Sequence, residues 1–124
     1  SEAAQRLLQE AARYLGTPYV WGGYSPSGFD CPGFVSYCLT HSGVRNTGRL
    51  TAQGLYDICT PVSESDVQPG DLIFFTGTYN AGVPVTHIGI YVGGGQMIHC
   101  GHPVQYTSIY SSYWQSHFYG FGRW

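Results

Sequence analysis

The sequence predicts an α+β domain in which N-terminal helices pack on a central antiparallel β-sheet. The first half of the chain places apolar residues at helical spacing. The second half holds short runs rich in aromatic and β-branched residues. Helices followed by strands, without regular alternation of the two, are typical of this class. The 124 residues match the size of one compact domain, and we expect that domain to come from a longer protein.

The first helix is expected over residues 2–15, because apolar residues recur there at steps of three and four. They are Leu7, Leu8, Ala11, Ala12 and Leu15. The hydroxyl of Ser1 is a suitable N-cap, and Gly16 is a suitable stop. A glycine- and proline-rich loop, GTPYVWGGYSPSGF, follows this helix.

A second helix is expected to begin near Cys31, with Asp30 or Cys31 as its N-cap. Pro32 falls in the first turn, where its missing N–H would have had no partner in any case. Gly43 is a suitable end. The apolar stripe of this helix is Phe34, Val35, Cys38 and Leu39. A shorter third helix is expected over residues 51–58.

Strands are expected after the turn QPGD, where aromatic and β-branched residues become frequent. The segments DLIFFT, THIGIYV and QMIHC span residues 71–76, 86–92 and 96–100. The glycines of 93–95 separate the last two as in a tight hairpin. Two further strands are expected near residues 104–109 and 117–123.

Composition and charge exclude several classes of partner. The chain has five arginines, no lysine and a formal net charge of −2 at pH 7, which gives no electrostatic basis for binding nucleic acid or an anionic membrane. No apolar run is long enough to span a bilayer. The first residues lack the layout of a signal peptide, so any export signal is expected outside these residues.

Cys31 is the strongest candidate for a reactive group. A helix N-terminus favours a thiolate, because its free N–H groups and its dipole stabilise negative charge. Three other roles are open to this residue: a buried structural thiol, half of a disulfide, or a metal ligand. The other cysteines are Cys38, Cys59 and Cys100, and their number leaves the disulfide state open.

The hairpin geometry brings two histidines together. With a three-residue loop at 93–95, paired residue numbers sum to 188, so Gly89 lies opposite His99 and leaves it room. His87 is then the diagonal neighbour of His99 on the same face, roughly 7–8 Å away between Cα atoms. A two-residue loop would place the two histidines on opposite faces. His102 is the alternative partner if the register slips.

Cys31, His87 and His99 together form a candidate catalytic triad. His87 would act as the base for the thiol, and His99 would orient His87, as in papain-like chemistry. A zinc site built from these three residues and Cys100 is the alternative. The short paired spacings of zinc ligands are missing, and Cys100 should point away from the site because it follows His99 on a strand.

Five segments resemble, in order and over nearly the whole chain, the NlpC/P60 family of peptidoglycan endopeptidases. LGTPYVWGG resembles the opening loop of the family, and GFDCPGFVSYC resembles its nucleophile segment. VQPGDLIFF is similar to the first core strand, THIGIYVGGGQMIHC to the histidine hairpin and FYGFGRW to the closing strand. One such motif alone is weak, but the ordered set is specific.

The resemblance implies a circularly permuted papain-like fold and one NlpC-type catalytic domain over residues 1–124. It implies Cys31 as nucleophile, His87 as base and His99 as the third polar residue of a thiol peptidase. The substrate implied is the peptidoglycan stem peptide, cut between D-γ-glutamate and diaminopimelate or lysine. The protein is then expected in the cell wall, secreted or at the cell surface, with other domains in the same chain. No metal or organic cofactor is implied.

The same resemblance marks Tyr19 and Asp30 as substrate-binding residues, the carboxylate for an amine of the peptide and the phenol for a hydrogen bond. One residue departs from the family pattern, because Pro32 stands where serine is usual. Proline removes a hydroxyl and an amide donor. The oxyanion is then expected to be held by the backbone N–H of Cys31, with Tyr19 as a second donor.

Two other functions are compatible with the sequence. One is a wall-binding module that has lost catalysis, which Pro32 favours. The other is transfer of the acyl group to an amine instead of water, which the same three residues also permit.

Overall fold

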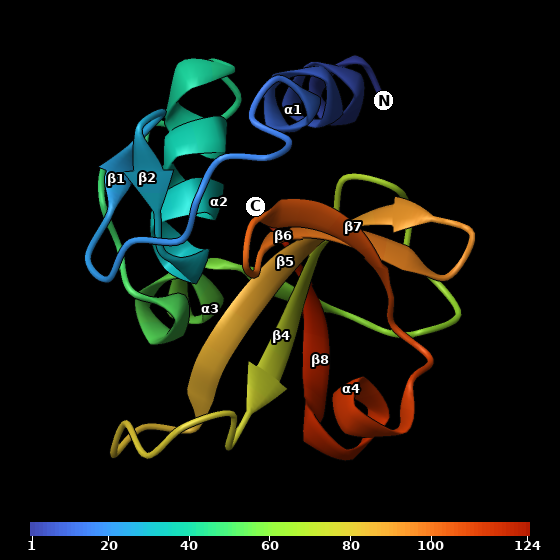
Figure 1. Ribbon diagram of the computed structural model, residues 1–124. Helices are drawn as coiled ribbons and strands as arrows, with labels where there is room; N and C mark the ends of the chain where they lie inside the picture. Colours follow the sequence, from blue (N-terminus) through green and yellow to red (C-terminus); the bar gives the residue numbers. More distant parts are fainter.

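The computed structural model describes all 124 residues and has the α+β architecture that the sequence predicts (Figure 1). Its helices are α1 (Glu2–Ala12), α2 (Cys31–His41), α3 (Ala52–Ile58) and α4 (Ser112–His117). Its strands are β1 (Tyr24–Ser25), β2 (Gly28–Phe29), β3 (Thr60–Val62), β4 (Leu72–Thr76), β5 (Val85–Gly93), β6 (Gln96–Cys100), β7 (Val104–Ser108) and β8 (Phe118–Arg123). None of the helices combines the length and the apolar content that a membrane crossing requires.

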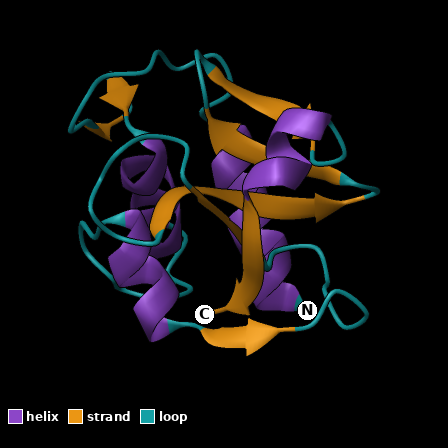
Figure 2. Ribbon diagram, turned by 90° about the horizontal axis from the view of Figure 1, so that it is seen from below, coloured by secondary structure: helices purple, strands orange, loops and turns teal.

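Six strands form one sheet in the order β3-β8-β4-β5-β6-β7, and every neighbouring pair is antiparallel. Helices α2 and α3 pack against β5, and α1 packs against α2. Figure 1 shows these three helices grouped beside the sheet, while α4 lies near β8. Figure 2, from below, shows the strands crossing the middle of the molecule with helices on both sides. The predicted packing of N-terminal helices on an antiparallel sheet is confirmed.

Alternation along the strands divides the buried residues between two faces of the sheet. The larger core lies on the side of α1, α2 and α3, and its sheet residues include Leu72, Phe74, Ile88, Ile90, Ile98 and Cys100. The smaller core lies on the opposite face, and it consists of Ile73, Phe75, Met97, Ile109 and Phe121. Trp114 of α4 packs on this smaller core.

The local sequence explains where the first two helices begin and end. Ser1 caps α1, and its hydroxyl accepts from the N–H of Ala4 at 3.1 Å. Asp30, one of the two predicted caps, begins α2 by accepting from the N–H of Gly33 at 2.7 Å. Helix α1 ends three residues earlier than predicted, and Leu15 is exposed because residues 13–16 continue as turns.

Four elements were not predicted, and each is short. The β1-β2 hairpin lies inside the segment expected as a loop. Strand β3 has three residues and depends on pairing with β8, about sixty residues away in sequence. Helix α4 has six residues and no fully buried side chain, so it lacks the periodic apolar stripe that a sequence pattern would reveal.

The β5-β6 turn differs from the prediction in its detail but not in its consequence. Gly93 pairs with Gln96, so the turn contains only two residues, and its glycines take positive φ values. A β-bulge between Tyr91 and Gly93 adds one residue to β5. Tyr91 therefore still pairs with Met97, as predicted, because the bulge restores the parity that a two-residue turn alone would change.

Candidate active site

Cys31 is the first residue of α2, at the predicted helix N-terminus. Its side chain is buried, and its sulfur lies 3.9 Å from the backbone oxygen of Thr86. No hydrogen bond joins the sulfur to His87 in this structure. If His87 acts as the base for this thiol, the thiol must therefore rotate from the Thr86 oxygen toward the His87 ring.

The protonation state of Cys31 differs from the one expected at a helix N-terminus. Burial raises the pKa of the Cys31 thiol to about 12, and the backbone amide of Ile88 offsets this only in part. The negative charge of neighbouring Asp30 raises the pKa further. The expectation of a resting thiolate is therefore wrong for this structure, because desolvation outweighs the favourable helix end.

His87 and His99 form the predicted pair. His87 Nε2 lies 2.9 Å from His99 Nδ1, and the two rings meet edge to face. Gly89 leaves room beside them, because a Cβ there would crowd the Cβ of His99 at 3.1 Å and the sulfur of Met97 at 3.0 Å. The second nitrogen of His99, Nε2, lies 2.9 Å from the hydroxyl of Thr107. The predicted geometry of the two imidazoles is confirmed, whereas their catalytic roles stay predictions.

Both imidazoles are held neutral at pH 7. Burial lowers the pKa of His87 to about 3, and the neighbouring His99 lowers it further. Burial also lowers the pKa of His99 to about 4. The cavity that these residues line therefore holds an uncharged thiol and two neutral rings at pH 7.

Trp114 covers the histidine pair. Its ring lies 5.0 Å from the His87 ring at an interplanar angle of 30°, and it meets the His99 ring edge to face at 5.3 Å. It also contacts Phe75 at 4.6 Å. Trp114 therefore packs against the imidazoles themselves, where an aromatic face can stabilise an imidazolium.

Two cavities meet at Cys31. The first, which we call the Arg49 cavity, has a volume of about 520 Å³, and its polar lining includes Asp30, Arg49, Gln53 and Asp57. The second, the histidine cavity, has a volume of about 320 Å³ and is lined by His87, His99, Cys100, His102, Tyr113 and Trp114, among others. Both are also lined by Tyr19, Trp21, Cys31, Tyr79 and Thr86. Cavities on both sides of the sulfur suit a peptide that is bound on both sides of the bond that is cut.

Asp30 lines the Arg49 cavity, but its carboxylate is already engaged. Both of its oxygens accept from the guanidinium of Arg49 at 2.6 Å. They also accept from the backbone N–H groups of Gly22 and Gly33. A Cβ on Gly33 would lie 2.3 Å from Arg49, so glycine is needed for this approach. A substrate amine would meet the ion pair, not a free carboxylate as the sequence suggested.

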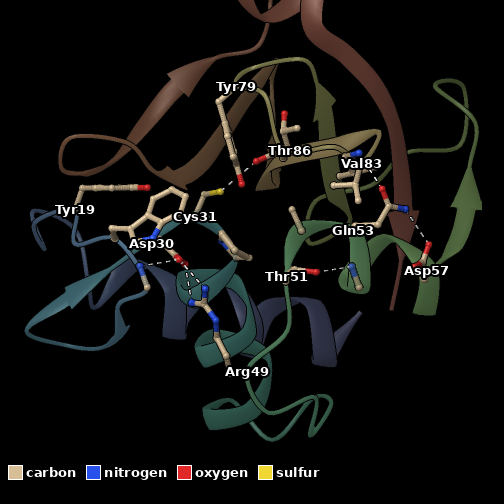
Figure 3. A pocket seen from close by; sticks show the side chains of 17 residues that line it. Tyr19, Asp30, Cys31, Arg49, Thr51, Gln53, Asp57, Tyr79, Val83 and Thr86 are labelled. Atoms are coloured by element: carbon tan, nitrogen blue, oxygen red, sulfur yellow. Dashed lines mark hydrogen bonds and ion pairs between the residues drawn. The ribbon is translucent and has the colours of Figure 1, made fainter.

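Two tyrosines face the sulfur from opposite loops. Figure 3 shows the hydroxyl ends of Tyr19 and Tyr79 turned toward the side on which Cys31 lies. Burial raises the pKa of Tyr19 to about 12, and burial and the nearby Cys31 raise that of Tyr79, so both phenols remain hydrogen-bond donors. The Tyr19 ring lies 4.6 Å from the ring of His102. His102 is therefore placed beside Tyr19, and His99 is the partner of His87.

Cys100 lies on the opposite strand face from His99, as alternation requires, yet it lines the histidine cavity. The expectation that it points away from the site is wrong, because its face is the one on which α2 packs. Its thiol donates to the backbone oxygen of Phe29 at 3.2 Å. All four cysteines are free thiols, and no group of three or more potential ligand side chains is disposed to hold a metal ion.

Sequence reasoning missed Arg49, Tyr79 and Thr107. Arg49 lies in a loop with no pattern that points to Asp30, nineteen residues earlier. Tyr79 lies in the β4-β5 loop, where an aromatic residue could equally be a surface residue. Thr107 could have been found, because the antiparallel register of the strand after β6 makes it the diagonal neighbour of His99.

The model of the NlpC/P60 family matches residues 16–123, which hold every residue of the candidate site. The chain belongs to the NlpC/P60 family. It is 46% identical over 118 residues to a probable endopeptidase p60 of Listeria seeligeri, covering 94% of this chain and 21% of that protein. It is 41% identical over 121 residues to the bifunctional muramidase/DL-endopeptidase CwlT of Bacillus subtilis, covering 96% of this chain and 36% of that protein.

Solved NlpC/P60 structures share the fold. A protein from Staphylococcus aureus, described as similar to a lipoprotein of the NLP/P60 family, superposes with a TM-score of 0.92 at 43% identity. The superposition covers 99% of this chain and 41% of that one. The predicted papain-like α+β fold class is thereby confirmed. The chain spans about a fifth to a third of the length of the two curated relatives.

Proposed function

We propose that this NlpC/P60 domain is a cysteine endopeptidase that hydrolyses peptidoglycan stem peptides, with Cys31 as nucleophile and His87 as base. One observation carries the proposal. The 2.9 Å contact between His87 and His99 creates an oriented imidazole in the same cavity that Cys31 lines. The substrate class comes from a relative named a probable peptidoglycan endopeptidase, LytE of Bacillus subtilis, and the bond type from the DL-endopeptidase name of CwlT.

The reaction begins with transfer of the thiol proton of Cys31 to Nδ1 of His87 as the sulfur attacks the amide carbonyl. Nδ1 is the nitrogen available, because Nε2 contacts His99. The backbone N–H of Cys31 and the hydroxyl of Tyr19 donate to the oxyanion. His87 then protonates the leaving amine, and the acyl group remains as a thioester. Water, deprotonated by His87, hydrolyses the thioester and regenerates the thiol.

The position of His87 gives the groove a direction. His87 lines only the histidine cavity, and the amine that leaves must lie within its reach. The half of the peptide on the amine side therefore occupies the histidine cavity, and the acyl half occupies the Arg49 cavity. A γ-linked D-glutamate keeps its α-carboxylate free, and Arg49 is the cation that can meet it. This match favours the bond after D-γ-glutamate, before diaminopimelate or lysine.

The setting follows from the substrate. A stem-peptide hydrolase works in the cell wall, so we infer a secreted or surface-attached protein in which residues 1–124 are the catalytic domain. Because the chain spans only part of its curated relatives, other domains of the same protein are proposed partners. The proposed chemistry needs neither nucleic acid nor a cofactor.

The test is cleavage of a defined substrate. Purified L-alanyl-D-γ-glutamyl peptides carrying lysine or diaminopimelate are incubated with the domain, and the products are identified by mass spectrometry. We expect one cut, after D-γ-glutamate, that disappears in Cys31→Ala. If Cys31→Ala cleaves as the unchanged domain does, or if neither yields product, the cysteine endopeptidase assignment is wrong.

A binding module without catalysis is the competing function. The raised pKa of Cys31 and the presence of Pro32 are the observations in its favour. Such a module would retain stem peptide in a pull-down without cutting it, and Cys31→Ala would change neither result. The acyl-transfer alternative is distinguished in the same assay by adding an amine, which would appear in the product in place of water.

A further inference from the structure

His99 has a partner at each of its two ring nitrogens. Nδ1 lies 2.9 Å from His87 Nε2, and Nε2 lies 2.9 Å from the hydroxyl of Thr107. In the β6-β7 register Gln105 lies opposite His99, so Thr107 is its diagonal neighbour on the same face. A polar chain of three side chains therefore crosses three adjacent strands, from β7 through β6 to β5.

The chemistry of the thiol fixes the direction of the hydrogen bonds in this chain. A neutral imidazole has one N–H and one lone pair. To accept the proton of Cys31, His87 must keep Nδ1 unprotonated, so its own proton lies on Nε2 and is donated to His99. The proton of His99 must then lie on Nε2, where its partner is the oxygen of Thr107.

We propose that Thr107 is a positioning residue of this centre: it accepts from His99 Nε2 and so holds the tautomer in which His87 can take the thiol proton. The opposite direction would place the His87 proton on Nδ1, facing the sulfur, and would leave no base. The kinetic consequence rests on the proposed peptidase function, whereas the direction of the hydrogen bonds is testable without substrate.

The surroundings make this contact matter. His99 is 4% exposed, and burial lowers its pKa to about 4, so its ring is neutral at pH 7. Thr107 is half-buried on an edge strand and makes no other side-chain hydrogen bond within the protein. Its oxygen has two lone pairs, and its own proton can turn to solvent. Without this oxygen, the N–H of a buried ring would lose its only hydrogen-bond acceptor within the protein.

The first experiment measures the tautomers directly in the unchanged domain at pH 7, without substrate. Nitrogen-15 NMR of labelled histidine rings, assigned with His87→Gln and His99→Asn, reports which nitrogen carries each proton. We expect His99 and His87 to be protonated at Nε2 and unprotonated at Nδ1. A proton on Nδ1 of His99 would overturn the proposal, and it would do so whether or not the domain is a peptidase.

The second experiment uses Thr107→Val, which keeps the shape and the strand propensity but removes the acceptor. We expect kcat to fall by about 10- to 100-fold, as for loss of a supporting hydrogen bond to a functional histidine, with KM unchanged because Thr107 lines neither cavity. Thr107→Ser, which keeps the hydroxyl, should restore turnover. The matched control is Thr60→Val, the same change at an exposed position of β3 on the opposite edge of the sheet.

The outcomes separate positioning from packing. If Thr107→Val is turned over like the unchanged domain, or if Thr107→Ser loses as much activity as Thr107→Val, the proposal is wrong. If Thr107→Val does not fold, shown by loss of its thermal transition, Thr107→Ser and the tautomers of the unchanged domain still decide. If the domain cuts no peptide at all, a shifted His99 tautomer in Thr107→Val supports the proposal and an unshifted one contradicts it.

Discussion

The two cavities beside Cys31 are built from different chemistry. The Arg49 cavity has charges of both signs, from Asp30, Asp57 and Arg49, and ordered polar groups such as Gln53, which accepts from the N–H of Val85. The histidine cavity contains no aspartate, glutamate or arginine, and most of its walls are aromatic or imidazole rings. Under the proposed function, this contrast assigns recognition of a charged peptide to the Arg49 cavity and proton transfer to the histidine cavity.

The histidine cavity suits proton transfer because burial favours the uncharged form of both Cys31 and His87. It raises the pKa of Cys31 to about 12 and lowers that of His87 to about 3, so each favours the uncharged form. A charged side chain in that cavity would stabilise one ion over the other. The charges of the Arg49 cavity act on the thiol in opposite directions, since Asp30 raises its pKa and Arg49 lowers it, so burial decides that the pair stays neutral.

The largest expected effect comes from removing the proposed base in the histidine cavity. His87→Gln removes the base, and a thiol with so high a pKa is then almost never ionised at pH 7. We expect kcat to fall by about 10²- to 10⁴-fold, the range for a lost general base. Substrate affinity, measured by calorimetry in the Cys31→Ala background, should change little. His41→Gln is the matched control, since His41 lines neither cavity, and equal losses in the two variants would refute the division.

The sequence predicts the residues of the histidine cavity better than those of the Arg49 cavity, for a physical reason. His87 and His99 are placed by strand register, which a hydrophobic pattern and a glycine turn specify, and even the unpredicted bulge preserved the parity. Arg49 is placed by a loop that joins α2 to α3, and loop conformation has no such periodicity. The contact of Asp30 with Arg49 is therefore visible only in the folded chain.

Burial, unlike register, was misjudged from sequence. The helix N-terminus at Cys31 was predicted correctly, and so was its Asp30 cap, but the pKa of the thiol depends on how much water the fold removes. That quantity depends on side chains from distant elements, such as Thr86 and Ile88 of β5. Local sequence contains no information about them.

A second prediction concerns acid stability and sharpens the contrast. Burial holds the pKa of His99 at about 4, whereas an unfolded histidine titrates near 6.5. The unfolded state therefore binds more protons between these values, so stability from the neutral ring is complete above about pH 6.5 and is lost as the pH falls toward 4. We expect a loss on the order of 2 kcal/mol between pH 7 and pH 4.5 from this residue.

Urea unfolding at the two pH values measures that loss. His99→Asn keeps a hydrogen-bonding side chain but cannot titrate, so its stability should fall by less than that of the unchanged domain over the same interval. His41→Asn, at an exposed position, should behave like the unchanged domain. An equal loss in His99→Asn and in the unchanged domain would show that other groups, such as His87 or the carboxylates, and not the His99 ring, cause the acid sensitivity.

The smallest expected effect comes from removing the cation of the Arg49 cavity. Arg49→Gln removes the cation proposed to meet the substrate carboxylate, and we expect KM to rise about tenfold, the worth of one charge-assisted hydrogen bond, with kcat nearly unchanged. Arg123→Gln is the matched control. Arg123 also donates two hydrogen bonds to a buried aspartate, Asp71, at 2.7 Å, but it lines neither cavity. Each guanidinium is partly exposed, but its removal leaves a buried carboxylate without its cation, so we expect both variants to lose a similar amount of stability, about 1 to 3 kcal/mol. A fall in kcat with KM unchanged in Arg49→Gln would mean that the Arg49 cavity serves catalysis, since a residue that only recognises the substrate should weaken binding alone.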